Sequence, residues 1–267
     1  MIITRRFALA NLSLVLFCFL TGCDNQDKLP EKPQLTGSAA ILENLKNFPD
    51  SFLLYEEAVQ FYRDADKYDS AIFYASKAIE KDTTISRFWY IRGTLMIENG
   101  DTLAGIKNLE RSVAIATDPR VLSELGRIWA VTKNPKALKV STVLQDSKEE
   151  KASLDAWFIE GLYYSSIGRK AEAISWFDKC LKLSYTYMEA YIEKGNALYD
   201  LGKYEAAVSV FQKAVTVQNN FDIGYYYLGR TLEKLNRKDD AAEAYRTALM
   251  YDKNYADARD ALQRLEK

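Results

Sequence analysis

The chain has 267 residues, of which 48% are hydrophobic and 27% are charged, and its formal net charge at pH 7 is −1. This composition excludes a largely disordered chain, and the balanced charge excludes the basic surface that nucleic-acid binding needs. Histidine is absent, which removes the commonest general base, the usual nucleophile pairs and the most frequent zinc ligand. We therefore expect no catalytic site, no metal site, no cofactor, no small-molecule substrate and no nucleic-acid partner.

Residues 1–22 have the features of an export signal. A basic start, with Arg5 and Arg6, precedes a mostly apolar run over residues 7–20. This run is too short and too interrupted to span a bilayer as a permanent helix, but it fits the apolar region of a signal peptide. We exclude residues 1–22 from the predicted fold.

The segment Leu20-Thr21-Gly22-Cys23 resembles the lipobox of bacterial lipoproteins. The resemblance implies cleavage before Cys23 and acylation of that residue, and each buried methylene of the acyl chains would stabilise membrane attachment by about 0.8 kcal/mol. An uncleaved secretory signal with an incidental cysteine is the alternative. Residues 23–37 are polar and contain two prolines, which predicts a flexible tether behind the lipidated Cys23.

The lipobox implies a lipid-anchored protein of the bacterial cell envelope. Asp24, directly after Cys23, is an inner-membrane retention signal in some bacteria, so the inner membrane is one possible location. The Tyr-rich and Lys-rich composition is more typical of bacteria in which that sorting rule does not apply. We therefore favour the outer membrane.

Small residues recur along the chain at a fixed interval. Beginning at residue 52, the chain divides into equal blocks 52–85, 86–119, 120–153, 154–187, 188–221 and 222–255. Three of these blocks share a glycine and an alanine at equal positions, namely Gly161, Gly195 and Gly229, and Ala173, Ala207 and Ala241. Repeats as long as these blocks are typical of a solenoid built from helical hairpins.

This register resembles the tetratricopeptide repeat, whose pattern is W-x2-L-G-x2-Y, then A-x3-F, then P. The fourth block matches through Trp157, Gly161, Tyr164, Ala173 and Phe177. The resemblance implies an all-α fold, a right-handed α-α superhelix of about six helix-turn-helix repeats. It also implies a capping helix within 38–51 before the repeats and another within 256–267 after them.

The third block, 120–153, is degenerate. Leu125-Gly126 and Trp129 come one residue early, and the A-x3-F element is missing. This block either keeps the stack continuous or changes its curvature locally. Cys180 stands at a repeat position that needs a small side chain, so we interpret it as a buried, unreactive thiol.

In the tetratricopeptide family, the first helix of each repeat lines a concave groove that usually holds a peptide of a partner. At repeat positions 5 and 9 this chain places apolar, aromatic or polar side chains that point to a groove for a peptide with hydrophobic anchors. The predicted groove residues are Tyr90, Arg127, Phe158, Ile192, Asn196, Tyr226 and Arg230. Packing of these side chains against neighbouring helices is the alternative interpretation.

The family's carboxylate clamp needs Lys at position 5 together with Asn at position 9. Asn196 is accompanied by Ile192, so that specificity is not supported. We expect a lipid-anchored scaffold or adaptor that binds proteins or peptides and is not an enzyme. The alternative is a structural, self-associating component of a pilus, secretion or outer-membrane assembly machinery.

Overall fold

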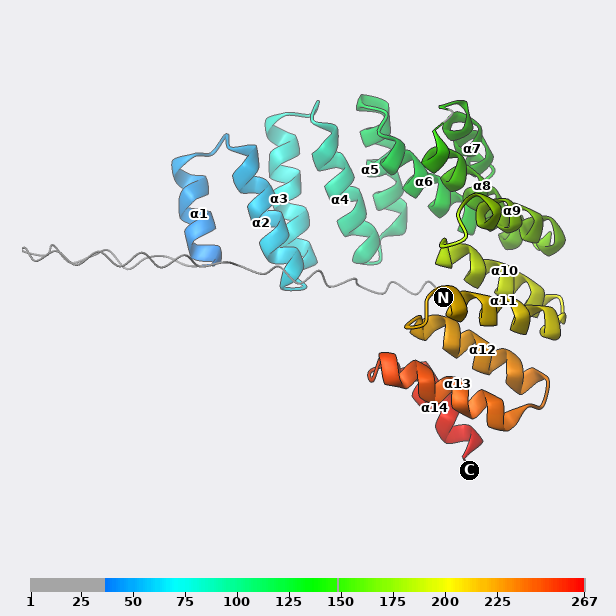
Figure 1. The fold of residues 1–267 in the computed structure, drawn as a ribbon. Coiled ribbons are helices and arrows are strands. Elements are labelled where there is room, and N and C mark those ends of the chain that lie inside the picture. The colour runs from blue at the N-terminus through cyan, green and yellow to red at the C-terminus, as the bar shows by residue number, and fades with distance from the viewer. Residues whose placement is uncertain (1–36, 148, 267) are drawn as a thin grey trace, which may run out of the picture. The chain divides into compact units, whose positions relative to one another are not determined.

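The computed structural model describes residues 37–147 and 149–266. The predicted signal peptide, Cys23 and all but the last residue of the predicted tether lie outside this part of the chain. The described residues form fourteen α-helices and no strand (Figure 1). The all-α prediction is therefore confirmed. None of these helices is both long and apolar enough to cross a membrane.

The chain divides after Ala116 into two compact units. The first unit contains five helices, which are α1 (Ser38–Asn47), α2 (Phe52–Asp64), α3 (Tyr68–Lys81), α4 (Ser86–Glu98) and α5 (Thr102–Ile115). The second unit contains nine helices, which are α6 (Pro119–Val131), α7 (Lys136–Asp146), α8 (Glu150–Ser166), α9 (Lys170–Leu183), α10 (Met188–Asp200), α11 (Tyr204–Val217), α12 (Asp222–Lys234), α13 (Lys238–Tyr251) and α14 (Ala256–Leu265).

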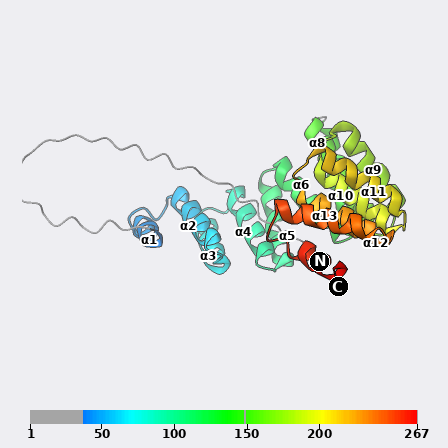
Figure 2. The same ribbon diagram turned by 60° about the horizontal axis from the view of Figure 1, so that its bottom comes forward.

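The helices pack as hairpins of consecutive helices, two in the first unit and four in the second (Figures 1 and 2). The first helix of each pair is called the A helix here and the second the B helix. In the first unit the pairs are α2 with α3 and α4 with α5, and α1 packs against α2. In the second unit the pairs run from α6 with α7 to α12 with α13, and α14, which follows the last pair as a further A helix, packs against α13.

Each A helix turns into its B helix through one residue in the left-handed backbone region. These residues are Asp66 (φ 57°), Gly100 (φ 94°), Lys133 (φ 61°), Gly168 (φ 86°), Gly202 (φ 71°) and Asn236 (φ 58°). The following amide closes the turn, as in the hydrogen bond from the Lys203 amide to the Leu198 carbonyl at 2.9 Å. This is the helix-ending motif that favours glycine, and it makes the connection short enough for the two helices to pack side by side.

Three hairpins of the second unit pack an aromatic ring of the B helix directly on a glycine of the A helix. The ring of Tyr245 would lie 2.8 Å from a Cβ added to Gly229, and the rings of Phe177 and Phe211 would lie closer still to a Cβ added to Gly161 and Gly195. A side chain at these positions would force the helices apart. The recurrent spacing of small and aromatic residues within the period therefore follows from close packing between two helices.

The hairpin of α6 and α7 is held differently. Its left-handed residue, Lys133, comes one residue earlier in its block than Gly100 does in the block before, which confirms the early register of the third block. The nearest atoms to Gly126 are aliphatic; a Cβ there would lie 2.7 Å from Val140 on α7 and 2.8 Å from Ile159 on α8. Without the aromatic ring that the other three hairpins of the second unit place on the corresponding glycine, α8 approaches α6 directly.

Candidate functional site

The A helices of the second unit form a continuous row, because α6, α8, α10, α12 and α14 each contact the next A helix. Six of the seven predicted groove residues lie on these helices. They are Arg127 on α6, Phe158 on α8, Ile192 and Asn196 on α10, and Tyr226 and Arg230 on α12. Tyr90 lies on α4 of the first unit and is partly buried.

The prediction that Phe158 is an exposed anchor is wrong. Only 3% of Phe158 is exposed, and its ring lies 5.7 Å from the ring of Phe177 and 5.1 Å from that of Tyr187, measured between centroids. The guanidinium of Arg127 covers the ring from 4.6 Å. Phe158 therefore belongs to the core beneath the A-helix row, because the shifted register of α6 brings an arginine over it.

Arg127 is committed to its own neighbours. It donates hydrogen bonds to Asp155 on α8 at 3.2 Å, to Glu189 on α10 at 3.3 Å and to the Tyr187 hydroxyl at 2.5 Å. Burial raises the pKa of Tyr187 above its usual value, so this phenol stays neutral. Arg127 thus connects α6, α8 and α10 rather than offering a free cation to a ligand.

Asp155, Tyr187 and Glu189 were not among the predicted groove residues. Asp155 and Glu189 do occupy equal positions in successive repeats, and this regularity is visible in the sequence. Their partner cannot be found from the period, because Arg127 stands in the block whose register is shifted.

Asn196 on α10 retains unused hydrogen-bonding capacity. Its Oδ1 is buried and has no hydrogen-bond partner among the described residues. Ile192, one turn earlier, is partly buried against the core of the second unit. A buried polar atom without a partner costs about 1–3 kcal/mol, so a ligand donor that reached Oδ1 would recover that free energy.

Arg230 lies on α12 at the same repeat position as Asn196. Its guanidinium is 4.2 Å from the ring centroid of Tyr199 and 5.2 Å from that of Tyr227. Within the described chain it makes no ion pair or hydrogen bond, so its donors are available. Tyr226 beside it packs against the rings of Tyr245 and Tyr255, with centroids 5.9 and 5.1 Å away.

Glu193 lies between Ile192 and Asn196 on α10. Burial raises the pKa of its carboxyl above the ordinary value of 4.5, the cation of Lys170 opposes this shift, and the carboxylates of Glu189 and Asp200 add to it. The Glu193 carboxyl is therefore poorly solvated and lies near other carboxylates, which together disfavour its ionised form.

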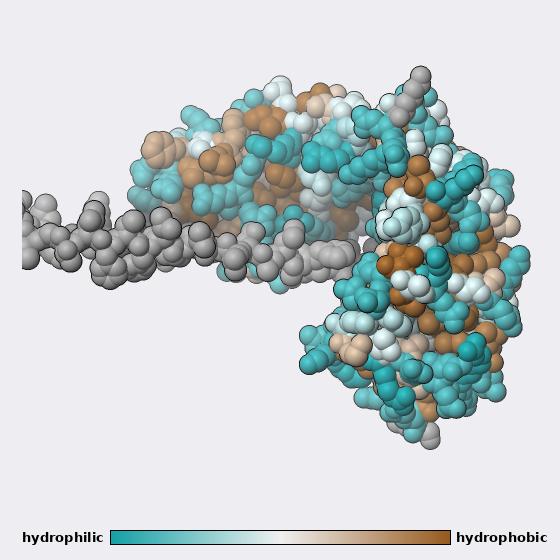
Figure 3. Space-filling view, in the orientation of Figure 1, coloured by the Kyte–Doolittle hydropathy of each residue, from teal (hydrophilic) through white to brown (hydrophobic). Residues whose placement is uncertain are grey.

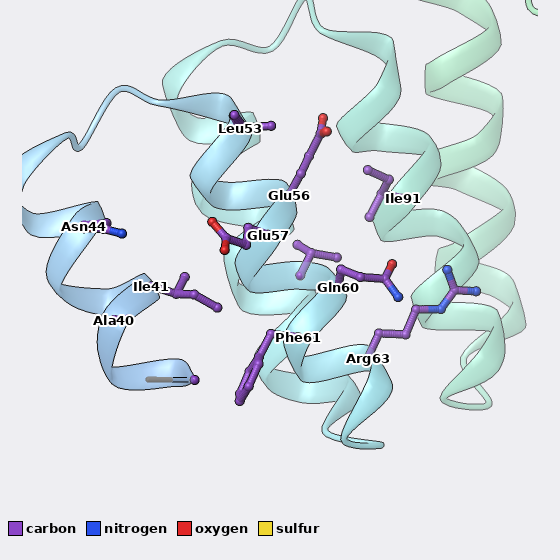
Figure 4. Close-up of a pocket in the computed structure, with 12 residues that line it drawn as sticks. Ala40, Ile41, Asn44, Leu53, Glu56, Glu57, Gln60, Phe61, Arg63 and Ile91 are labelled. Carbon is purple, nitrogen blue, oxygen red and sulfur yellow. The ribbon is translucent and has the colours of Figure 1, made fainter. Parts of the chain in front are cut away.

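The first unit contains a groove that the sequence analysis missed. It has a volume of about 990 Å³ and is lined by α1, by α2 and by Ile91 of α4 (Figure 4). Apolar and polar surface alternate over α1 and α2 (Figure 3). The sequence indicates only that α1 caps the repeats. Its second role, as one wall of a groove, follows from the way α1 packs on α2.

Cys180, the cysteine of the described chain, is placed where its thiol is unreactive. Cys180 is buried, and burial raises the pKa of its thiol to about 12, which keeps it neutral. Its interpretation as a buried thiol is confirmed. Within residues 37–147 and 149–266 no cluster of three Cys, Asp or Glu residues suits a metal ion.

Known protein families match the second unit of this chain. Three models of the tetratricopeptide repeat match residues 154–187, 195–236 and 223–255. The protein is thus an all-α superhelical protein. More narrowly, residues 154–187 and 195–255 match the tetratricopeptide repeat, a fold that suggests a scaffold for protein interactions. No curated protein matches the sequence.

Several solved structures share the fold. A tetratricopeptide repeat protein from Parabacteroides merdae ATCC 43184 is 16% identical, with 85% of this chain and 90% of that chain covered and a TM-score of 0.70. A thermophilic TPR protein of Thermus thermophilus is 18% identical (68% and 98% covered, TM-score 0.56). The pilF protein of Pseudomonas aeruginosa is 16% identical (80% and 96% covered, TM-score 0.55). Identities this low establish similarity of fold alone.

Proposed function

We propose that this protein is a lipid-anchored scaffold of the bacterial cell envelope that binds peptide segments of partner proteins along the A-helix row of the second unit. The observation that carries the proposal is the buried Oδ1 of Asn196, which has no hydrogen-bond partner in the described chain. A peptide backbone supplies the N–H donor that this atom lacks.

The neighbouring helix supplies the complementary group. Arg230 has free donors for a peptide carbonyl or carboxylate, and its position over the Tyr199 and Tyr227 rings holds the guanidinium in place. Tyr226 adds aromatic surface next to it. An acceptor on α10 and a donor on α12 suit an extended segment that crosses successive A helices.

The anchor part of the proposal is supported by the sequence of residues 1–23. Acylation of Cys23 would hold the repeats at a membrane surface, and we favour the outer membrane for the reasons of composition given above. Presentation of a peptide-binding surface at the membrane is the activity of an adaptor. Catalysis has no part in it.

The test is crosslinking in intact cells followed by identification of the recovered partners. Replacing Asn196 and Arg230 together with Ala should remove most of the crosslinked partner, while circular dichroism shows an unchanged helical spectrum. The matched control replaces Gln212 and Lys213 with Ala. These two residues are an exposed amide and an exposed cation on the B helix α11. Equal partner recovery from both double variants would contradict the proposed site.

Self-association is the second candidate function. Phe73 on α3 and Leu103 on α5 are 52% and 76% exposed, and both lie on B helices of the first unit. Exposed apolar side chains on these helices can support contacts between copies. The mass of the purified protein by light scattering distinguishes the two functions, since a monomer argues against self-assembly.

A further inference from the structure

The groove of the first unit has an apolar floor. Figure 4 shows Ile41 of α1 and Phe61 of α2 pointing into the space between these helices, with Ile91 of α4 on the other side of α2. Ile41 is 7% exposed, whereas Leu53 at the rim is 73% exposed. Leu53 thus offers a free apolar surface to a side chain that entered the groove.

The charged groups of the groove are acidic where they are free. Arg63 is paired with Glu98 on α4, so its charge is neutralised within the unit. Glu57 is exposed and points toward α1, and it makes no ion pair or hydrogen bond with any described residue. An acidic side chain of a ligand would meet an unneutralised carboxylate here.

Glu56 adds a second carboxylate. It is ion-paired with Arg87, yet its Oε1 is buried and lacks a hydrogen bond of good geometry. Gln60 beside it already donates to Asp64 at 2.7 Å. The groove therefore presents acceptors and apolar surface together, with no uncommitted cation among its lining residues.

We infer that this groove is a docking site for a partner peptide that carries an apolar side chain next to a Lys or Arg. The apolar side chain fills the space between Ile41, Leu53 and Phe61, and the cation pairs with Glu57. Because all lining residues belong to the first unit, this site is distinct from the A-helix row around Asn196. A result that excludes binding at one of these sites therefore does not exclude binding at the other.

Binding of defined peptides by fluorescence anisotropy tests the inference. The full chain is placed in nanodiscs of neutral phosphatidylcholine, so that basic peptides find no anionic lipid. The probe is a fluorescein-labelled Gly-Ser octapeptide with two Leu and two Lys; matched probes carry Glu instead of Lys, or Ser instead of Leu. We expect only the Leu-Lys peptide to bind, more weakly as salt screens the carboxylates.

Three variants assign that binding to the groove. Glu57→Lys should weaken it about tenfold or more, as expected for a lost charge-assisted contact. Leu53→Ser should weaken it through loss of apolar contact, and Asn44→Trp should block the groove from the α1 wall. Matched controls are Glu205→Lys on α11 and Val143→Ser on α7, which change an exposed carboxylate and an exposed aliphatic side chain in the second unit.

Other outcomes overturn the inference. Equal binding of the Lys and Glu peptides, or unchanged binding by Glu57→Lys, would remove the charge argument, and absence of binding would remove the site. Dimerisation that Asn44→Trp abolishes would assign the groove to a second copy of the chain. Binding that appears only after deletion of residues 24–36 would assign it to the segment that precedes α1.

Discussion

The guanidinium of Arg127 lies 4.6 Å above the ring of Phe158, in the position that a ligand would otherwise take on this side chain. Two residues predicted to face a partner thereby satisfy each other. The same arginine reaches Asp155 and Glu189, so one side chain connects three successive A helices. Stability, rather than ligand contact, is the property that these residues should affect.

Replacing Arg127 with Ala should destabilise the second unit by on the order of 2–3 kcal/mol, because the cation–π contact and the charged hydrogen bonds are lost together. Urea unfolding followed by circular dichroism measures this. Arg127→Lys should recover part of the loss, since it keeps the charge without the planar donors. A shift no larger than that of Lys213→Ala would contradict the connecting role.

Replacing Glu193 with Gln should stabilise the protein at pH 7 and have little effect at pH 4. The folded-state pKa of this carboxyl is raised by burial, so ionisation opposes folding once the pH rises above the unfolded value of 4.5. Below that pH both states are protonated and Glu resembles Gln. Melting temperatures of the two proteins across this range test the sign; a gain that is largest at low pH would refute it.

Replacing Lys133 with Gly should stabilise the α6–α7 hairpin by about 1 kcal/mol, because Lys133 has a left-handed backbone (φ 61°) that glycine adopts without steric cost. The converse change, Gly202→Ala at φ 71°, should destabilise the α10–α11 hairpin by a similar amount. Thermal unfolding measures both. Shifts of the same sign would contradict the turn analysis.

The Cys180 thiol should resist alkylation in the folded protein. Its pKa of about 12 leaves almost no thiolate at pH 8, and its burial blocks the reagent. Mass spectrometry of the peptide that contains Cys180, after iodoacetamide treatment with and without urea, measures the protection. Rapid modification without urea would show that α9 opens readily in the native state.

Replacing Cys23 with Ser should move the protein from the membrane fraction to the soluble fraction, since the acyl chains would have no attachment site. Cys180→Ser is the matched control and should leave the distribution unchanged. Separation of the inner and outer membranes then reports the location of the unaltered protein. Persistence of the Cys23→Ser variant in the membrane fraction would exclude lipidation as the anchor.

The period of the fold was visible in the sequence because its cause is local. Gly161, Gly195 and Gly229 recur at equal positions in their blocks since each must allow an aromatic ring of its own hairpin to approach. The early register of Leu125-Gly126 and Trp129, visible in the sequence, continues in the structure as an early turn at Lys133. Contacts within one hairpin span few residues, so a single sequence records them.

The binding surfaces depended on contacts between hairpins, which the period does not encode. Phe158 occupies a groove position by its number, yet Arg127 from another block covers it. Conversely, the free carboxylate of Glu57 gained significance only when α1 was found to form the wall opposite it. Sequence by itself determined the helices, their pairing and their turns. Tertiary structure alone decided which polar groups are left unpaired, because pairing is settled between side chains far apart in the chain.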